Sequence, residues 1–317
     1  MGTLYNQLTQ IERYQIQTLH ELQFSARAIA KKLDRSNKTI SLELKRCHGN
    51  YCAEMAHRLS RQKRQDASKY TQLNMTQRQN LDWLLSLDLS PEQIAGRMKL
   101  EGFDAGVSQQ TLYRWIVKLN WRSRLPRKGK RYRKRAGLQA GASLIPNRTD
   151  IDERPAIVEQ NSELGHWEGD TVYGQDSYFV TLVERVSKIF ISTRVPNKTK
   201  KTVGRAIRKL LKPYRSMCKT ITFDNGGEFA GHAEVSRALK CKIYFAKPYQ
   251  SWQRGLNENT NGLLRRYFPK GMAIALLSSQ QIKEAIFKIN LRPRKVLNYL
   301  SPIEFLLGKR VSLMLSI

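Results

Sequence analysis

The sequence has few acidic residues for its size. Its 317 residues include 26 Asp and Glu against 56 Lys and Arg, which gives a formal net charge of +30 at pH 7. Both halves of the chain, divided after residue 150, have a large excess of Lys and Arg, so the charge does not come from a basic tail. A charge this far above what solubility requires indicates a polyanionic partner. Nucleic acid is the partner that we expect first.

Long apolar runs and closely spaced cysteines are also missing. No apolar run approaches the roughly 18 residues of a membrane span, and no signal peptide is recognisable. We therefore expect a cytoplasmic protein without a membrane partner. The four cysteines form no Cys-x-x-Cys pair and have no His at a zinc-site spacing, so we expect reduced structural thiols rather than metal ligands.

The beginning of the chain has the pattern of a helix-turn-helix. Thr9 and Glu12 have the capping-box spacing of a helix start. Residues 25–46 then predict two helices around a polar turn, with Ile40 and Leu44 of the second helix facing inward. The second helix turns outward residue types that contact phosphates and base edges in a major groove, namely Lys38, Ser41, Lys45 and Arg46. A plain helical hairpin with solvated lysines is the alternative.

A similar unit follows over residues 89–116. Ser90 has the position of an N-cap, Pro91 that of the first helical residue, and Gln93 closes a capping box. A second helix follows Ser108, and its polar residues are candidates for DNA contact: Gln109, Gln110, Thr111, Tyr113 and Arg114. The same helix also has Leu, Trp and Ile side chains, so dimerisation or internal packing stays open as its use.

A strongly basic stretch then separates the helical part from a strand-rich part. Residues 122–135 hold nine Lys and Arg among fourteen residues and no acid, as in a solvated linker or an arm along phosphates. The predicted organisation is a helix-turn-helix domain over 1–60, a second such domain over 61–121, a basic linker over 122–160 and a catalytic domain over 161–317.

The last domain has the element order of a known α/β fold. Three β-rich runs precede a helix, a strand, a helix and a strand, and this β-β-β-α-β-α-β order is that of the ribonuclease H-like fold. The second helix of this order is expected over 228–239, and a further helix is expected after the last strand, over 254–268. The predicted fold class is therefore multi-domain, with an all-α helix-turn-helix N-terminal region and an α/β ribonuclease H-like catalytic domain.

Three carboxylates of this domain stand where they can converge. Asp170 lies on the first strand, Asp224 at the end of the fourth, and Glu258 on the following long helix. Converging acids repel one another unless a cation sits among them, and hard oxygen ligands favour Mg²⁺ or Mn²⁺, two of which support phosphodiester chemistry. Glu258 shares a helix side with Arg254 and Arg265, which we assign to DNA contact.

Two further acids lie near these three. Glu168 is on the same strand face as Asp170, because the two are two residues apart, and is a candidate supporting residue behind the metal ligands. Glu228 follows the fourth strand, where its position suits helix capping better than metal ligation.

The motifs resemble the insertion-sequence-thirty family of bacterial transposases. The matching stretches are GHWEGDTVYG, FDNGGEF, YFAKPYQSWQRGLNENTNGLLRRYFPKG, LRPRKVLNYLSPIEF, LTQIERYQI, RAIAKKLDRS and SPEQIAGR, and they span nearly the whole chain. The gap of 33 residues between Asp224 and Glu258 is the family's own spacing. The sequence departs from the family's pattern at Leu42, where Arg is expected, and at Gln253, where Glu is usual.

The resemblance implies an Asp, Asp, Glu triad at Asp170, Asp224 and Glu258 and a homo-oligomer in the DNA complex. It also implies that the helical N-terminal part of the chain, called the head below, recognises terminal inverted repeats. The expected function is that of a DNA transposase, which uses two Mg²⁺ or Mn²⁺ ions to cleave double-stranded DNA at the element's ends and to transfer the strand to target DNA. A DNA-binding regulator with an inactive nuclease-like domain is the first alternative. A nuclease for RNA in hybrids is the second.

Overall fold

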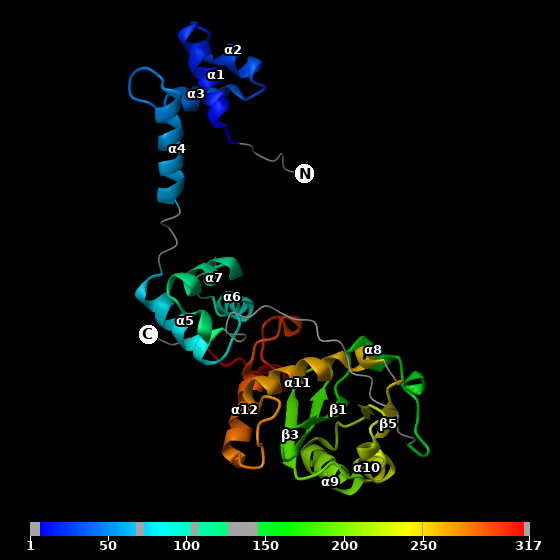
Figure 1. Ribbon diagram of the computed structural model, residues 1–317. Helices are drawn as coiled ribbons and strands as arrows, with labels where there is room; N and C mark the ends of the chain where they lie inside the picture. The colour runs from blue at the N-terminus through cyan, green and yellow to red at the C-terminus, as the bar shows by residue number, and fades with distance from the viewer. Residues whose placement is uncertain (1–6, 68–72, 103–106, 126–144, 249, 314–317) are drawn as a thin grey trace. The chain divides into compact units, whose positions relative to one another are not determined.

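The computed structural model describes residues 7–67, 73–102, 107–125, 145–248 and 250–313 (Figure 1). Its internal contacts divide the chain into two compact units, Met1–Leu73 and Asn74–Ile317. The domain boundary expected after residue 60 lies inside a helix, α4 (Ala53–Ala67), and the second predicted helical domain belongs to the same unit as the sheet. Residues 126–144 of the predicted basic linker lie outside the described residues.

The first unit contains four helices with the predicted helix-turn-helix at its centre. The helices are α1 (Gln10–Glu21), α2 (Ala26–Lys32), α3 (Asn37–Leu44) and α4 (Ala53–Ala67). Thr9 and Glu12 form the predicted capping box, while Ser25 and Ser36 cap the next two helices. Ile40 is fully buried, as expected, because α3 packs on Ile16 and the other apolar residues of this small core.

Three more helices open the second unit. They are α5 (Met75–Ser86), α6 (Pro91–Leu100) and α7 (Gln109–Lys118). Ser90 and Gln93 form the predicted capping box with Pro91 in the first turn, and Ser108 caps α7. These local predictions are confirmed, because each capping signal lies within four consecutive residues and needs no distant partner.

The sheet has five strands in the order β3-β2-β1-β4-β5. The strands are β1 (His166–Tyr173), β2 (Tyr178–Glu184), β3 (Phe190–Val195), β4 (Thr220–Phe223) and β5 (Lys242–Phe245). The first three pair antiparallel as successive hairpins, while β4 is parallel to β1 and β5 is parallel to β4. This is the topology predicted for a ribonuclease H-like domain.

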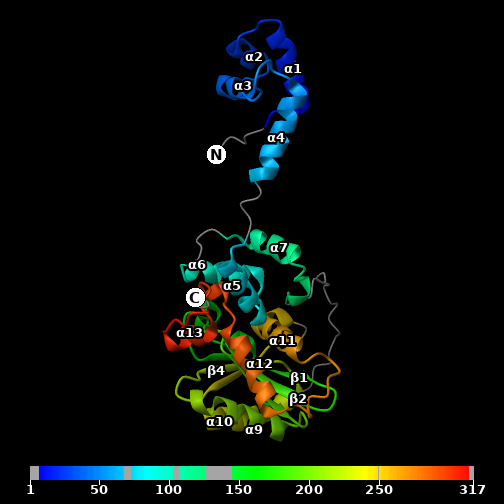
Figure 2. The same cartoon turned by 90° about the vertical axis from the view of Figure 1, so that its left-hand side faces the viewer.

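Helices cover both faces of this sheet (Figures 1 and 2). α9 (Lys200–Leu211) and α10 (His232–Leu239) pack on one face, where the buried Trp167 and Phe223 point. The other face carries α11 (Gly255–Tyr267) and α12 (Ser279–Leu291). The remaining helices are the short α8 (Ile157–Gln160) and α13 (Pro302–Leu307). Among the described residues no helix is long and apolar enough to cross a membrane.

One predicted helix is shorter than expected. The segment 228–239 begins as a single 3-10 turn, Gly227–Phe229, and α10 starts only at His232 after Gly231. No side chain caps α10, so the expected capping role of Glu228 is wrong. The early turn instead leaves the Glu228 carboxylate free to accept a hydrogen bond from Thr171 Oγ1 at 2.7 Å.

The helices α5 to α7 are joined to the end of the chain by a buried ion pair. Arg97 is fully buried, and its Nη1 and Nη2 donate to the two carboxylate oxygens of Glu304 at 2.8 and 2.6 Å. Trp83 Nε1 donates to the Leu313 carbonyl at 2.9 Å, and Tyr267 Oη donates to Asp88 at 3.0 Å. The second helical region is therefore built into the unit that contains the sheet.

Candidate active site and DNA-contact surface

Two of the predicted acids come together on neighbouring strands, Asp170 within β1 and Asp224 directly after β4. Glu168 of β1 stands opposite Thr222 of β4 in the parallel register. Asp170 and Asp224 each lie two residues further along, so both side chains point to the same face of the sheet. That face is the one covered by α11. The parallel pairing thus places two carboxylates from distant parts of the chain side by side.

Short hydrogen bonds orient both aspartates. The Thr171 amide donates to Asp170 Oδ1 at 2.8 Å, and Asn261 Nδ2 from α11 donates to Asp170 Oδ2 at 2.8 Å. The Gly226 amide donates to Asp224 Oδ1 at 3.0 Å. A Cβ at Gly226 would lie 2.6 Å from a Glu228 carboxylate oxygen, so the first glycine of the Gly-Gly pair leaves room for the acids.

Arg254 supplies the positive charge between these aspartates. Its Nη2 lies 3.3 Å from Asp224 Oδ2, its Nη1 lies 4.0 Å from Asp170 Oδ1, and Nη1 also donates to the Gly169 carbonyl at 3.1 Å. The prediction placed Arg254 among the DNA-contact residues. The structure differs, because the residue is 8% exposed and its guanidinium faces the carboxylates.

The electrostatics of Asp170 reflect this crowding. The pKa of its carboxyl group is raised to about 7, mainly because the group is buried and also because the Asp224 and Glu228 carboxylates lie nearby, while Arg254 opposes the rise. A carboxyl group with such a raised pKa, held beside other acids, is a common property of functional sites. The charge of the site is therefore not balanced by Arg254 alone.

Glu258 does not join the two aspartates. It lies in the first turn of α11 and is exposed. Within the described ranges, no group of three or more His, Cys, Asp or Glu side chains is arranged so that it could hold a metal ion. The structure brings Asp170 and Asp224 together and leaves the third predicted ligand on the neighbouring helix.

Glu168 holds the helix that carries Glu258. Its side chain is buried, accepts a hydrogen bond from the Asn257 amide at 3.1 Å and pairs with Arg185 Nη1 at 2.5 Å. Burial raises the pKa of this carboxyl group, against the opposing effect of Arg185. Because Asn257 is in the first turn of α11, Glu168 satisfies an amide that the helix itself cannot. Glu168 was predicted to support the metal ligands, and in the structure it contacts the first turn of the helix that carries Glu258.

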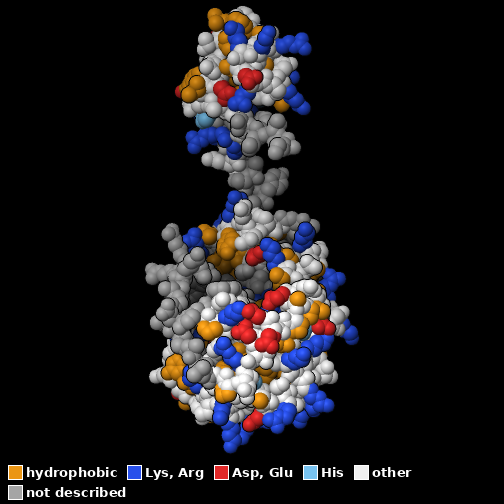
Figure 3. Space-filling model, turned by 90° about the vertical axis from the view of Figure 1, so that its right-hand side faces the viewer, with side chains coloured by type: hydrophobic (Ala, Val, Ile, Leu, Met, Phe, Trp, Pro, Cys, Tyr) orange, Lys and Arg blue, Asp and Glu red, His pale blue; other side chains and the backbone are white. Residues whose placement is uncertain are grey.

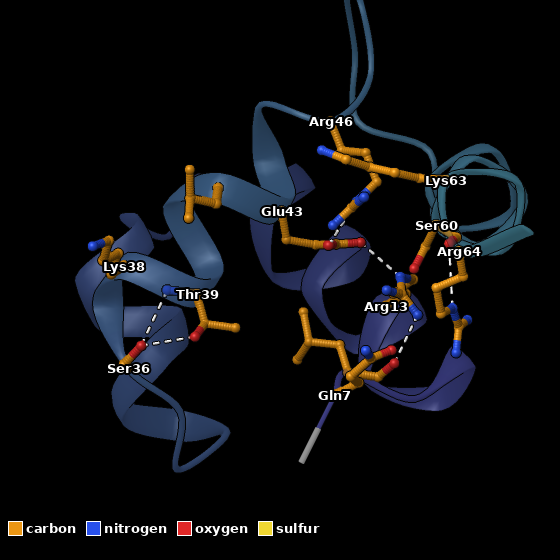
Figure 4. Close-up of a pocket in the computed structure, with 12 residues that line it drawn as sticks. Gln7, Arg13, Ser36, Lys38, Thr39, Glu43, Arg46, Ser60, Lys63 and Arg64 are labelled. Carbon is orange, nitrogen blue, oxygen red and sulfur yellow. Dashed lines mark hydrogen bonds and ion pairs between the residues drawn. The ribbon is translucent and has the colours of Figure 1, made fainter. Parts of the chain in front are cut away.

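Two of the four DNA-contact candidates of the first unit, Lys38 and Arg46, line a groove of about 470 Å³. In Figure 4, Lys38 and Thr39 come from α3 on one side, and Lys63 and Arg64 from α4 on the other. The remaining candidates of α3 do not line it: Ser41 is half-buried and Lys45 is exposed.

Lys63 and Arg64 were not among the predicted DNA-contact residues, because the polar sequence of residues 58–70 predicts a connector between the two helical units. Their spacing on one helix, four and five residues after Leu59, could have signalled a basic helix face.

The candidates of the second unit occupy the outer side of α7. Gln109, Gln110 and Arg114 are exposed, whereas Leu112 and Trp115 are buried. α7 thus packs through its apolar side and keeps its polar side accessible. Arg265, on α11, is half-buried. On the face of the second unit shown in Figure 3, acidic side chains gather near the middle, with Lys and Arg around them.

A helix-turn-helix unit and a ribonuclease H-like sheet with neighbouring acids on its first and fourth strands define a protein of the integrase and transposase class. Residues 5–47 match the helix-turn-helix domain family, and residues 160–251 match the integrase core domain family.

Three relatives match nearly the whole chain. The transposase for insertion sequence element IS4351 of Bacteroides fragilis is 39% identical over 94% of this chain and 94% of its own length. The transposase InsI for element IS30A of Escherichia coli (strain K12) is 33% identical over 94% of this chain and 83% of its own. The transposase for insertion sequence element IS1086 of Cupriavidus metallidurans is 33% identical over 96% of this chain and 95% of its own length.

The chain belongs to this family of insertion-sequence transposases. The family resemblance found in the sequence is thereby confirmed, and membership implies an enzyme that cleaves and joins nucleic acid.

Proposed function

We propose that this protein is an Asp-Asp-Glu transposase, in which Asp170, Asp224 and Glu258 act on the phosphodiester bonds at the ends of an insertion sequence. The observation that carries the proposal is the position of Asp170 and Asp224, each two residues beyond the paired Glu168 and Thr222 of the parallel strands, with Arg254 between them. Two carboxylates held around a cation, beside a helix with a third, match the donors that phosphodiester chemistry requires.

We propose that the first unit recognises the terminal inverted repeats. α3 is the second helix of the helix-turn-helix and would enter the major groove, with Lys38, Ser41, Lys45 and Arg46 contacting phosphates and base edges. Lys63 and Arg64 of α4 would add phosphate contacts from the other wall of the groove. Gln109, Gln110 and Arg114 on the exposed side of α7, and Arg265, would contact the DNA held by the second unit. Joining two ends requires two catalytic domains, which supports a homo-oligomer in the DNA complex.

The chemistry of the acids at the site suits a divalent metal, although the structure brings only two of the three together. Carboxylate oxygens are the ligands that Mg²⁺ and Mn²⁺ prefer, and the Arg254 guanidinium shows that a positive charge is stabilised between Asp170 and Asp224. When bound, two such ions would activate an attacking hydroxyl group and stabilise the leaving oxygen. Asp170, Asp224 and Glu258 would hold them, with Glu258 approaching from α11.

The remaining residues of the site position these ligands. Asn261 and the Thr171 amide fix the Asp170 carboxylate, and the Gly226 amide fixes that of Asp224. Glu168 anchors the first turn of α11 and so sets the position of Glu258. These contacts would restrict the carboxylates to one arrangement before DNA binds, which is how positioning contributes to catalysis.

The test compares Asp170→Asn, Asp224→Asn and Glu258→Gln with the unmodified protein, on a duplex that carries the inverted repeats flanking the gene. Each variant should lose strand joining in Mg²⁺ and in Mn²⁺ while binding the repeat as tightly as before, because each loses a ligand and keeps the head. Glu228→Gln is the matched control, since it removes a neighbouring acid and should retain joining. Joining activity in any triad variant would remove that residue from the assignment.

A DNA-binding regulator with an inactive nuclease-like domain is the second candidate. The observation that favours it is the exposed Glu258, which lies apart from the two aspartates that share Arg254. The same assay separates the two functions. A regulator would bind the repeats but would join no strands in either metal.

A further inference from the structure

The groove in the first unit combines basic walls with one exposed apolar side chain from α3. Leu42 lines this groove and is 59% exposed. The basic residues around it come from both helices: Lys38 and Arg46 from α3 and its end, and Lys63 and Arg64 from α4 (Figure 4). An exposed leucine is common on protein surfaces, but this one lines a groove that has Lys and Arg side chains on both walls.

The packing of α3 keeps Leu42 on the outer side. Ile40 is fully buried, and Glu43 is 2% exposed. The Glu43 carboxylate accepts from Arg13 Nε at 2.6 Å and from Arg46 Nε at 2.8 Å, so the helix cannot rotate without breaking a buried ion pair. Residues four apart share a helix face, which aligns Leu42 with Lys38, and Arg46 lines the same groove just after α3 ends.

The positive charge around Leu42 indicates which kind of partner binds in this groove. A second copy of this chain would bring the same cations against these, and like charges at an interface are unfavourable. A DNA backbone complements them. In the major groove of B-DNA the thymine C5-methyl is the apolar group that base edges display, and side chains with apolar ends contact it.

We propose that Leu42 packs against the C5-methyl group of a thymine in the DNA that the head recognises, and so selects that base. The inference rests on the proposed function, because it requires α3 to lie in the major groove. Lys38, one turn before Leu42, and Arg46, just after the end of α3, would hold the backbone or neighbouring base edges and fix the register of Leu42. Leu42 is then a specificity-determining residue that contributes through shape and apolar contact, without a hydrogen bond.

The experiment removes the methyl group alone. The full-length protein first selects its preferred duplex from a random pool, and each thymine of that duplex is then replaced in turn by deoxyuridine. One replacement should weaken binding roughly fourfold, because burying one methyl or methylene group contributes about 0.8 kcal/mol and 1.4 kcal/mol is tenfold. In Leu42→Ala the same replacement should have no effect. Leu22→Ala, which removes an exposed leucine outside the groove, should keep the response of the unmodified protein.

The outcomes are distinct. Failure to select any sequence from the pool would contradict the proposed function itself. Selection without a methyl-sensitive thymine would overturn the role of Leu42 and leave the proposed function standing. Methyl sensitivity that persists in Leu42→Ala would assign the contact to another side chain, and loss of self-association in Leu42→Ala without a change in methyl sensitivity would assign Leu42 to a protein interface.

Discussion

Arg254 Nη2 lies 3.3 Å from Asp224 Oδ2, and the same guanidinium faces Asp170 at 4.0 Å. The site therefore contains an internal cation where a metal ion would balance the same carboxylates. Arg254 is four residues before Glu258, on the turn that leads into α11, so the cation and the third predicted ligand come from one segment. The internal charge and a divalent ion would compete for the aspartates.

Removing this internal cation should tighten metal binding. In Arg254→Gln the affinity for Mn²⁺ should rise about tenfold, equivalent to about 1.4 kcal/mol, because the ion no longer meets a fixed positive charge. The melting temperature without metal should fall, since Asp170 and Asp224 then repel each other unopposed. Titration calorimetry and thermal melts measure both, with Lys270→Gln as the control, an exposed cation just after α11. Weaker Mn²⁺ binding in Arg254→Gln would show that Arg254 instead organises the ligands.

Substitutions of Glu168 and Glu258 should differ in their effect on the stability of the fold. Glu168→Gln should lower the free energy of unfolding by about 3 to 5 kcal/mol, because it leaves the largely buried Arg185 without its closest carboxylate. Glu258→Gln should leave stability unchanged within about 0.5 kcal/mol, as expected for an exposed side chain. Urea denaturation of the two variants gives the comparison. Equal losses of stability in both would place Glu258 in the fold and not at the surface of the site.

The sequence predicted those features that depend on neighbouring residues or on regular spacing. The capping boxes at Thr9 and Ser90 each lie within four residues, and the alternation along β1 places Glu168 and Asp170 on one face. The convergence of Asp170 on the first strand with Asp224 at the end of the fourth was also predicted, and the parallel register of β1 and β4 explains it.

Contacts between distant residues could not be predicted in this way. Arg254 meets a carboxylate 30 residues away, and Glu168 meets an amide 89 residues away. An arginine beside Glu258 in a basic chain was assigned to DNA because charge alone does not distinguish a solvated guanidinium from a buried one. The integration of α6 with α13 through Arg97 and Glu304 depends on residues 207 apart, so the second helical region was expected to be a separate domain.

The ion pair between Arg97 and Glu304 should make the second unit sensitive to acid. Burial alone would raise the pKa of Glu304, but hydrogen bonds from Arg97 and from the Ser301 and Val311 amides outweigh burial and lower it. A carboxyl group with a lowered pKa in the folded state stabilises the fold above its unfolded pKa, about 4.3, and this stability is lost as pH falls through the folded pKa.

Glu304→Gln should therefore cost about 3 to 5 kcal/mol at pH 7 and reduce the further loss of stability on acidification below about pH 4.3. Urea denaturation across this pH range is the measurement. Glu284→Gln, an exposed acid on α12, is the control and should follow the unmodified protein at every pH. If Glu304→Gln kept full stability at pH 7, the buried pair would not join α6 to α13.

The basic side of α4 should carry part of the affinity for DNA. Lys63 and Arg64 are exposed and line the groove opposite α3, where a phosphate backbone flanking the major groove would pass. Each phosphate contact releases condensed counterions, so the double variant Lys63→Gln, Arg64→Gln should bind more weakly and reduce the slope of log K against log salt by about two. The loss should be similar for selected and random duplexes, because phosphates carry no sequence information.

Lys270→Gln with Lys283→Gln removes two exposed charges from the second unit and is the matched control. Fluorescence anisotropy over a salt series gives both slopes. An unchanged slope in the α4 variant would return this helix to the role of a connector, whereas a loss confined to the selected duplex would make it a second base-reading element.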